Sequence, residues 1–188
     1  MTSPDELRIL SFYRASELAG AVLLGRLGLM TKDDRIRVPL TEQCAEEAKH
    51  AWLFTKLIAD LGGVPERMTQ TYQSEVGKVL GLPESVVDIL CLTQLLEIET
   101  LAHYQRHAAM PGIDLRVRET LLTVIEDEEG HMDWVARELE ALKGELGAEV
   151  VNRAMARART ATAEVFATLR AHPIVRSYFG PREESAGA

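Results

Sequence analysis

The sequence predicts an all-α fold, a four-helix bundle of two helical hairpins joined by a long crossover, with a fifth helix at the C-terminal end. Three observations predict it. Apolar residues recur at helical spacing in five long segments, no strand-like alternation persists, and two short links flank one link of about 20 residues. Short links join antiparallel neighbours, so the first helix pairs with the second and the third with the fourth. We expect one domain over 1–188, with the bundle at about 5–143.

The first hairpin consists of the first two predicted helices. The first covers about 5–29, where apolar residues share one face. The second covers about 34–61 and ends at the glycine and proline run that begins with Gly62. Pro39 falls in its early part, where a proline can kink a helix. Residues 62–82 are interpreted as a linker, which is long for a compact helical protein.

The other three predicted helices follow this linker. The third covers 83–109 and the fourth 114–143, with a Pro-Gly break between them. The fifth covers about 147–171, is rich in Ala and Arg, and ends before Pro173. The tail at 181–188 is polar and rich in small residues, so we expect it to be disordered.

Composition and charge exclude several classes of function. The net charge is −8 and no dense run of Lys or Arg occurs, which disfavours nucleic acid as a partner. No apolar run approaches the roughly 18 residues of a membrane span. The N-terminus lacks a basic stretch followed by an apolar core, so it is not a secretory signal, and we expect a cytoplasmic protein.

The chain has two cysteines, Cys44 and Cys91, which are too few for a disulfide framework. Each lies among apolar residues of a predicted helix, which is typical of a small buried side chain. Two cysteines cannot build a four-sulfur iron site or an iron–sulfur cluster of their own. Any electrons that the protein needs would therefore come from a separate donor.

A repeated pair of residues carries the functional signal. Glu47 and His50 lie three residues apart, and so do Glu128 and His131. Residues three apart share a face of a helix. One such pair is weak evidence, because a solvated pair is the ordinary case. The second pair follows the first at a spacing of 81 residues, 128 minus 47 and 131 minus 50, which makes chance a poor explanation.

The repeat extends to a further acid in each half. Adding 80 to Glu17 gives Glu97, so each half offers a Glu on one helix and Glu-x-x-His on the next. This is the ligand set of carboxylate-bridged di-iron bundles. Glu99 is the alternative to Glu97. We choose Glu97 because its face is more apolar, and we expect Glu99, His103 and His107 to be solvated.

The charges of such a site balance. Four buried carboxylates without partners are very costly. Two divalent cations supply four positive charges against these four negative ones, and the histidines stay neutral. Oxygen and nitrogen ligands together suit iron or manganese, with zinc as a further option. The sequence therefore predicts two iron ions, with manganese or a mixed manganese–iron pair as alternatives.

Two acids next to the repeated pairs are candidates for an outer role. Glu46 and Asp127 each precede the Glu of a pair. A metal-bound histidine usually donates its other ring N–H to a carboxylate. We predict that Asp127 holds His50 and that Glu46 holds His131 across the bundle. The alternative is that both acids are ordinary surface residues.

Three stretches resemble known proteins. The sequence DEEGHMDW at 127–134 resembles the fourth-helix motif of bacterioferritin. The sequences SELAGA at 16–21 and EIETLAHY at 97–104 are similar to the demethoxyubiquinone hydroxylase group. Over about 5–142, the chain therefore resembles the ferritin-like di-iron carboxylate superfamily. The two-fold ligand pattern is specific for the site and says little about the reaction.

The resemblance implies a role for each ligand. Glu47 and Glu128 would bridge the metals, Glu17 and Glu97 would be terminal ligands, and each histidine would bind one metal. Bacterioferritin carries a haem-ligating Met directly after its second-helix Glu, but this chain has Ala48 there, so we predict no haem. Two alternatives for Tyr104 stay open: a catalytic residue that hydrogen-bonds a ligand or passes an electron, or a plain core tyrosine.

Two functions fit this site best. The first is an oxidoreductase, a di-iron oxidase or monooxygenase that activates O2 to oxidise a small organic substrate with electrons from an external donor. Small residues beside the ligands leave room for that substrate, or simply let the helices approach closely: Gly20, Ala21, Ala51 and Thr100. The second is a ferroxidase that stores iron in a cage. A scaffold with a structural metal, or with none, is a third option.

The sequence leaves the substrate, the electron donor and the type of oxidation undetermined. The oligomeric state is also open, with a homodimer as one option. A solution mass separates the two main functions, because a monomer or dimer excludes a storage cage.

Overall fold

A computed structural model describes residues 3–81, 83 and 85–179, and every regular element in this part of the chain is a helix. The predicted all-α class is therefore confirmed for these residues. Five long helices and two short ones occur in this order: α1 (Pro4–Met30), α2 (Asp34–Asp60), α3 (Tyr72–Leu80), α4 (Val86–Ala108), α5 (Leu115–Leu146), α6 (Ala148–Arg170) and α7 (Pro173–Phe179).

Polar residues at the N-cap positions explain where the long helices begin. Ser3, Asp33, Ser85 and Asp114 each accept a hydrogen bond from a backbone N–H of the first turn of α1, α2, α4 and α5, respectively. Such a cap satisfies a donor that has no partner inside the helix. The α4 cap also explains why this helix begins at Val86, three residues after the predicted start. Pro39 lies inside α2, as predicted.

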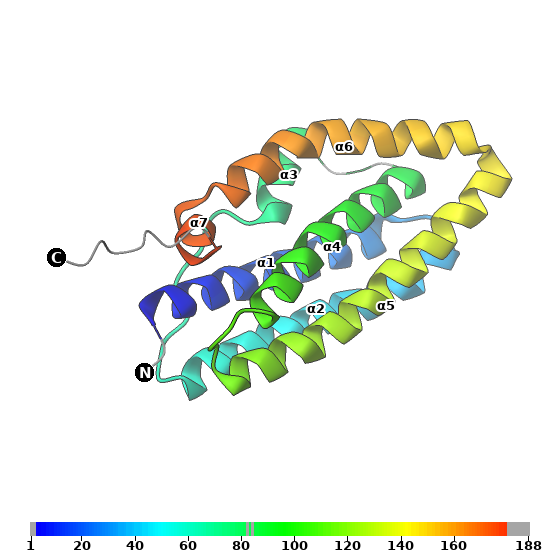
Figure 1. Ribbon diagram of the computed structural model, residues 1–188. Coiled ribbons are helices and arrows are strands. Elements are labelled where there is room, and N and C mark those ends of the chain that lie inside the picture. Colours follow the sequence, from blue (N-terminus) through cyan, green and yellow to red (C-terminus); the bar gives the residue numbers. More distant parts are fainter. Residues whose placement is uncertain (1–2, 82, 84, 180–188) are drawn as a thin grey trace.

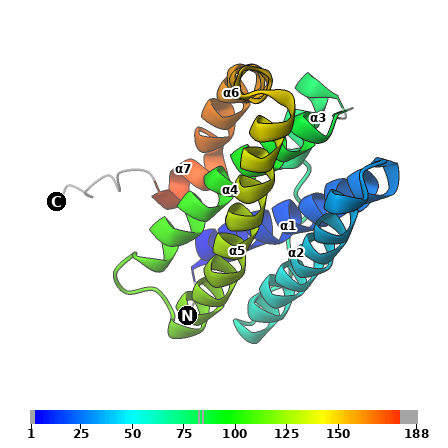
Figure 2. The same cartoon turned by 90° about the vertical axis from the view of Figure 1, so that its right-hand side faces the viewer.

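The helices pack as two hairpins with further helices at one side (Figure 1). α1 packs most extensively on α2, and α4 on α5, while α2 and α5 join the two hairpins. In the view turned by 90°, α6 lies above α4 and α5, and α3 lies beside α6 (Figure 2), where it contacts both α6 and α1. Buried apolar side chains from all of these helices form one continuous core.

Besides the later start of α4, the structure differs from the sequence prediction in three elements. Residues 62–82 are not wholly a linker, because α3 forms within them, with a reciprocal cap between Thr71 and Ser74. α7 follows α6 and packs on α1. α5 continues past its predicted end and stops before Gly147, whose φ of 90° lies in the left-handed region that favours glycine.

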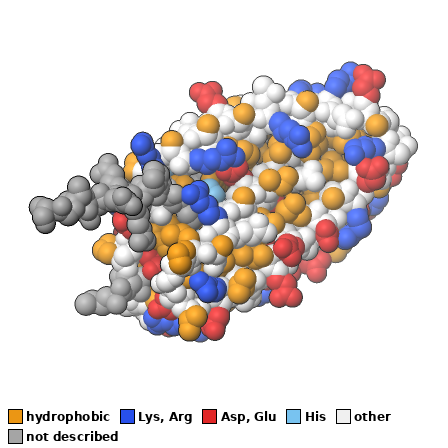
Figure 3. Space-filling model, viewed as in Figure 1, with side chains coloured by type: hydrophobic (Ala, Val, Ile, Leu, Met, Phe, Trp, Pro, Cys, Tyr) orange, Lys and Arg blue, Asp and Glu red, His pale blue; other side chains and the backbone are white. Residues whose placement is uncertain are grey.

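Several predictions about the chain ends and partners stay predictions. The tail at 181–188 lies outside the described residues. Within the described residues, no helix combines the length and the apolar character that crossing a bilayer requires. On the face in Figure 3, acidic and basic side chains are interspersed with apolar ones. The cytoplasmic location is a prediction that these observations leave untested.

Candidate metal centre

Four helices bring six buried side chains together inside the bundle. α1 and α4 each supply one carboxylate, and α2 and α5 each supply a carboxylate and an imidazole. Each of the six is at most 7% exposed: Glu17, Glu47, His50, Glu97, Glu128 and His131. These are the six residues that the sequence singles out as metal ligands.

The six side chains form two overlapping groups of potential ligands. In each group the ligand atoms lie within 4.8 Å of one another. Both groups contain Glu47 and Glu128; the first adds Glu17 and His50, and the second adds Glu97 and His131. Two adjacent sites that share two carboxylates are the arrangement expected of a pair of bridged metal ions.

Each histidine points one ring nitrogen into the cluster. His50 Nδ1 lies 3.2 Å from Glu17 Oε2 and 3.2 Å from Glu128 Oε1. His131 Nδ1 lies 2.9 Å from Glu128 Oε2 and 3.7 Å from Glu47 Oε1. The spacing of three residues produces this arrangement, because Glu and His at that spacing leave the helix on the same side.

The other ring nitrogen of each histidine meets an acid on the opposite helix. His50 Nε2 lies 3.0 Å from Asp127 Oδ2, and His131 Nε2 lies 2.7 Å from Glu46 Oε2. Asp127 also accepts a hydrogen bond of 2.9 Å from Lys49. These are the two cross-bundle contacts that the sequence predicts. A carboxylate at Nε2 fixes the ring orientation and leaves Nδ1 available as a ligand atom.

Gln43 belongs to the centre, although the sequence analysis does not include it. Its buried amide donates hydrogen bonds of 2.6 Å to Glu97 Oε1 and 3.3 Å to Glu47 Oε1, and its own oxygen accepts one of 3.2 Å from Trp134. The spacing between Gln43 and Glu47 is the sequence signal that could have identified this residue. Gln43 lies four residues before Glu47, so the two share a face of α2.

Tyr104 contacts the centre through Glu17. Its buried hydroxyl donates a hydrogen bond to Glu17 Oε1. Burial raises the pKa of Tyr104 well above its usual value, and the charge of Glu17 raises it further, so the hydroxyl keeps its proton. The two halves of the centre therefore differ: a phenol holds Glu17, whereas the Gln43 amide holds Glu97.

Burial and mutual repulsion set the protonation of the acids when no cation is present. Burial, followed by the charge of Glu128, raises the pKa of Glu47 and of Glu97 well above the usual range. Burial also raises the pKa of Glu128, but hydrogen bonds from His131 and His50 outweigh it and bring the value to about 2. Without a cation, bound protons therefore neutralise part of the negative charge of the cluster.

The histidines show the complementary behaviour. Burial lowers the pKa of His50, but hydrogen bonds to Glu128 and Glu17 outweigh it and raise the value to about 10. The same balance raises the pKa of His131. Glu128 Oε1 is buried, and it lies 3.2 Å from His50 Nδ1. A divalent cation fits this donor set, because it supplies the positive charge and an electrophile for that oxygen.

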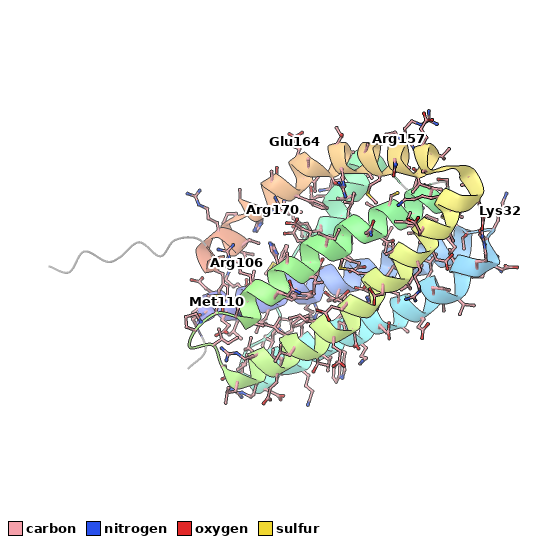
Figure 4. All side chains as sticks on the ribbon, turned by 45° about the vertical axis from the view of Figure 1, so that its right-hand side comes forward. Lys32, Arg106, Met110, Arg157, Glu164 and Arg170 are labelled. Atoms are coloured by element: carbon pink, nitrogen blue, oxygen red, sulfur yellow. The ribbon has the colours of Figure 1, made fainter. Side chains whose placement is uncertain are left out.

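Glu99 is not solvated, contrary to the sequence prediction. It is 6% exposed, and both of its carboxylate oxygens accept hydrogen bonds from Arg170 of α6. Figure 4 shows Arg170 extending from α6 towards α4. Glu99 thus has a cationic partner of its own, while Glu97 lies in the cluster.

His103 and His107 are also buried, although the sequence analysis predicts them to be solvated. The Tyr72 hydroxyl of α3 lies 3.2 Å from both ring nitrogens of His103. His107 Nε2 lies 2.8 Å from the Tyr178 hydroxyl of α7. Both partners come from short helices that the sequence analysis does not predict, and this explains the error.

No protein-family model matches this chain, and no solved structure matches it. The case for a metal centre therefore rests on the geometry and charge of the six side chains and their outer partners.

Proposed function

We propose that the protein is a ferritin-like di-iron oxidoreductase that uses O2 to oxidise a small organic substrate. One observation carries the proposal: two buried groups of ligand atoms that share Glu47 and Glu128. A structural site for a single ion needs no second group and no shared carboxylate. The doubled set supports a pair of ions held side by side.

The ligand types support iron or manganese as the metal. Both groups combine three carboxylates with one imidazole. Oxygen-rich sites with one nitrogen suit iron and manganese, whereas sulfur ligands, which favour zinc and copper(I), are absent from both groups. Four carboxylates also match the charge of two divalent ions.

The residues around the ligands would orient them. Asp127 and Glu46 hold the two imidazole rings from behind, so that each Nδ1 faces the shared carboxylates. Tyr104 and Gln43 hold the two carboxylates that the groups do not share. When bound, a reduced iron pair supplies electrons to O2, and an external donor has to replace them.

Aromatic rings on one side of the centre exclude water. Phe54 and Tyr13 are buried, with ring centroids 5.6 Å apart, and both contact the ring of Tyr104. Exclusion of water lowers the local dielectric constant, which strengthens the attraction between the carboxylates and the ions and limits side reactions.

The test is iron loading without oxygen, followed by mixing with O2. We expect about two iron ions per chain and a transient optical signal as O2 reacts. Glu97→Gln should lose much of the loading at the second group. Glu99→Gln is the matched control on the same helix, since Glu99 pairs with Arg170 outside the centre, and it should keep both ions. Unchanged loading of Glu97→Gln would refute the proposal.

Iron storage is the alternative that the same site permits. A storage protein takes up many more than two irons per chain and forms a shell of many subunits. We expect a monomer or dimer in solution, and iron uptake that stops near two ions per chain. A large shell with continued uptake would favour storage.

A further inference from the structure

A cavity of about 440 Å³ lies between α1, α3 and α4. Its apolar walls include Ala19, Val22 and Leu23 of α1 and Leu92 of α4. The volume is within the range of small-molecule sites, which are mostly apolar with a few polar groups. α3, which the sequence analysis interprets as part of a linker, forms the third wall through Gln73 and its neighbours.

This cavity lies next to the metal centre. A Cβ added to Gly20 would lie 2.8 Å from Glu47 Oε2 and 3.6 Å from Gln73 Nε2. The Gln73 side chain, which lines the cavity, and the shared carboxylate of Glu47 therefore flank the same point on α1. The absence of a side chain at Gly20 brings them close together.

Gln73 carries a buried oxygen that lacks a donor. Its Oε1 accepts no hydrogen bond from any of the described residues. Leaving a buried carbonyl oxygen without a donor is energetically costly. A ligand that brings a hydroxyl or amine to this end of the cavity would remove that cost once the Gln73 amide turns its oxygen toward the cavity.

The outer end of the cavity carries a positive charge. Arg26 is the one charged side chain among the described lining residues, and it is exposed. Arg26 follows Gly20 by six residues on α1, so the two positions are roughly 9 Å apart along the helix. An anionic head at Arg26 and a donor at Gln73 would bracket an apolar chain between them.

We propose that this cavity binds the organic substrate, and that the substrate is a small aliphatic acid with a hydroxyl or amine at its inner end. The identification of the ligand as substrate rests on the proposed function. Its carboxylate pairs with Arg26, its chain lies on the apolar walls, and its donor faces Gln73 Oε1. The inner end of the ligand is then the part nearest to Glu47, so oxidation occurs at that end.

Gly77 permits a direct test, because it lines the cavity and a Cβ there meets nothing within 4 Å. Gly77→Leu should narrow the cavity, because it adds an apolar side chain at a lining position whose Cβ has room. Gly144→Leu is the matched control, a helical glycine of α5 with equally open surroundings outside the cavity. Replacing a glycine inside a helix lowers the conformational entropy of the unfolded chain and favours the helix, so both variants should fold.

Isothermal titration calorimetry of the metal-free and iron-loaded protein would use three probes: octanoate, 8-hydroxyoctanoate and octan-1-ol. We expect 8-hydroxyoctanoate to bind best, Gly77→Leu to weaken it about tenfold or more, and Gly144→Leu to leave it unchanged. Arg26→Gln should weaken both acids about threefold and octan-1-ol not at all, as for an exposed ion pair.

Equal binding of the acids and octan-1-ol, or unchanged binding by Gly77→Leu, would overturn the inference. Iron loading of the same samples separates this result from a failure of the proposed function. Two bound irons without probe binding would refute the cavity alone, while probe binding without bound iron would refute the di-iron function.

Discussion

His50 Nε2 lies 3.0 Å from Asp127 Oδ2, a contact that joins α2 to α5. The reverse contact joins Glu46 of α2 to His131 of α5, with 2.7 Å between Glu46 Oε2 and His131 Nε2. Each helix thus supplies the acid that orients the other helix's imidazole. The proposed metal centre depends on this exchange, because the acid at each Nε2 comes from the other helix.

Removing the carboxylate charge at Asp127 tests the exchange. Asp127→Asn should weaken metal binding roughly 10–100-fold, since the ring of His50 loses the negative charge of the acceptor that fixes its orientation. Glu129→Gln is the control, an exposed acid two residues further along α5. Calorimetric titration with the metal measures the affinity of each variant. Wild-type affinity in Asp127→Asn would show that the contact has no role in binding.

Gly20 tests how closely the bundle packs on the shared carboxylate. A methyl group there would lie 2.8 Å from Glu47 Oε2, so Gly20→Ala should displace that carboxylate and weaken metal binding about tenfold. Gly28→Ala on the same helix places its Cβ 3.7 Å from Thr41, an ordinary contact, and should bind metal normally. Equal affinity of the two variants would contradict the described geometry.

Metal binding should release protons. The pKa of His50 is raised to about 10, so at pH 7 this ring holds a proton in the metal-free protein, and burial together with the charge of Glu128 raises the pKa of Glu47 and of Glu97, which favours their protonated forms. A metal ion requires them deprotonated, so affinity should rise with pH until it approaches the pKa of His50, about 10. Glu128, with its pKa lowered to about 2, contributes no proton.

Calorimetry in two buffers of different ionisation enthalpy counts the released protons. An affinity that falls with rising pH, or a titration without proton release, would contradict this electrostatic description of the centre.

Two buried tyrosines should respond differently to loss of their hydroxyl groups. Tyr104→Phe removes the hydrogen bond to Glu17 and should lower the free energy of unfolding of the metal-free protein by about 1.5–3 kcal/mol. Tyr13→Phe is the matched control, because its buried hydroxyl has no hydrogen-bond partner among the described residues. Tyr13→Phe should leave the free energy of unfolding unchanged or raise it. Urea unfolding compares them, and equal losses would refute the assigned bond.

The sequence identifies the centre because its signal lies within single helices and in their repeat. Spacing alone shows that Glu47 and His50 share a face, and the offset of 81 residues points to their counterparts. Gln43 follows the same rule, since it precedes Glu47 by four residues, and a fuller reading of that face would have included it.

The errors concern residues whose partners come from other helices. A helical face considered alone places Glu99 among polar neighbours, but Arg170 of α6 covers and neutralises it. His103 is buried by a tyrosine from the short helix in the crossover. Burial lowers the pKa of His103, which favours the neutral ring there. No periodicity within α4 contains this information, because packing against a distant segment decides it.

The number of metal ions held by each chain tests the central claim most directly. Native mass spectrometry of protein loaded with Fe(II) without oxygen should show about two ions per chain. The double variant with Glu47→Gln and Glu128→Gln should bind none while keeping its helical circular dichroism. A wild-type protein that retains no iron, or a double variant that loads like the wild type, would contradict the claim.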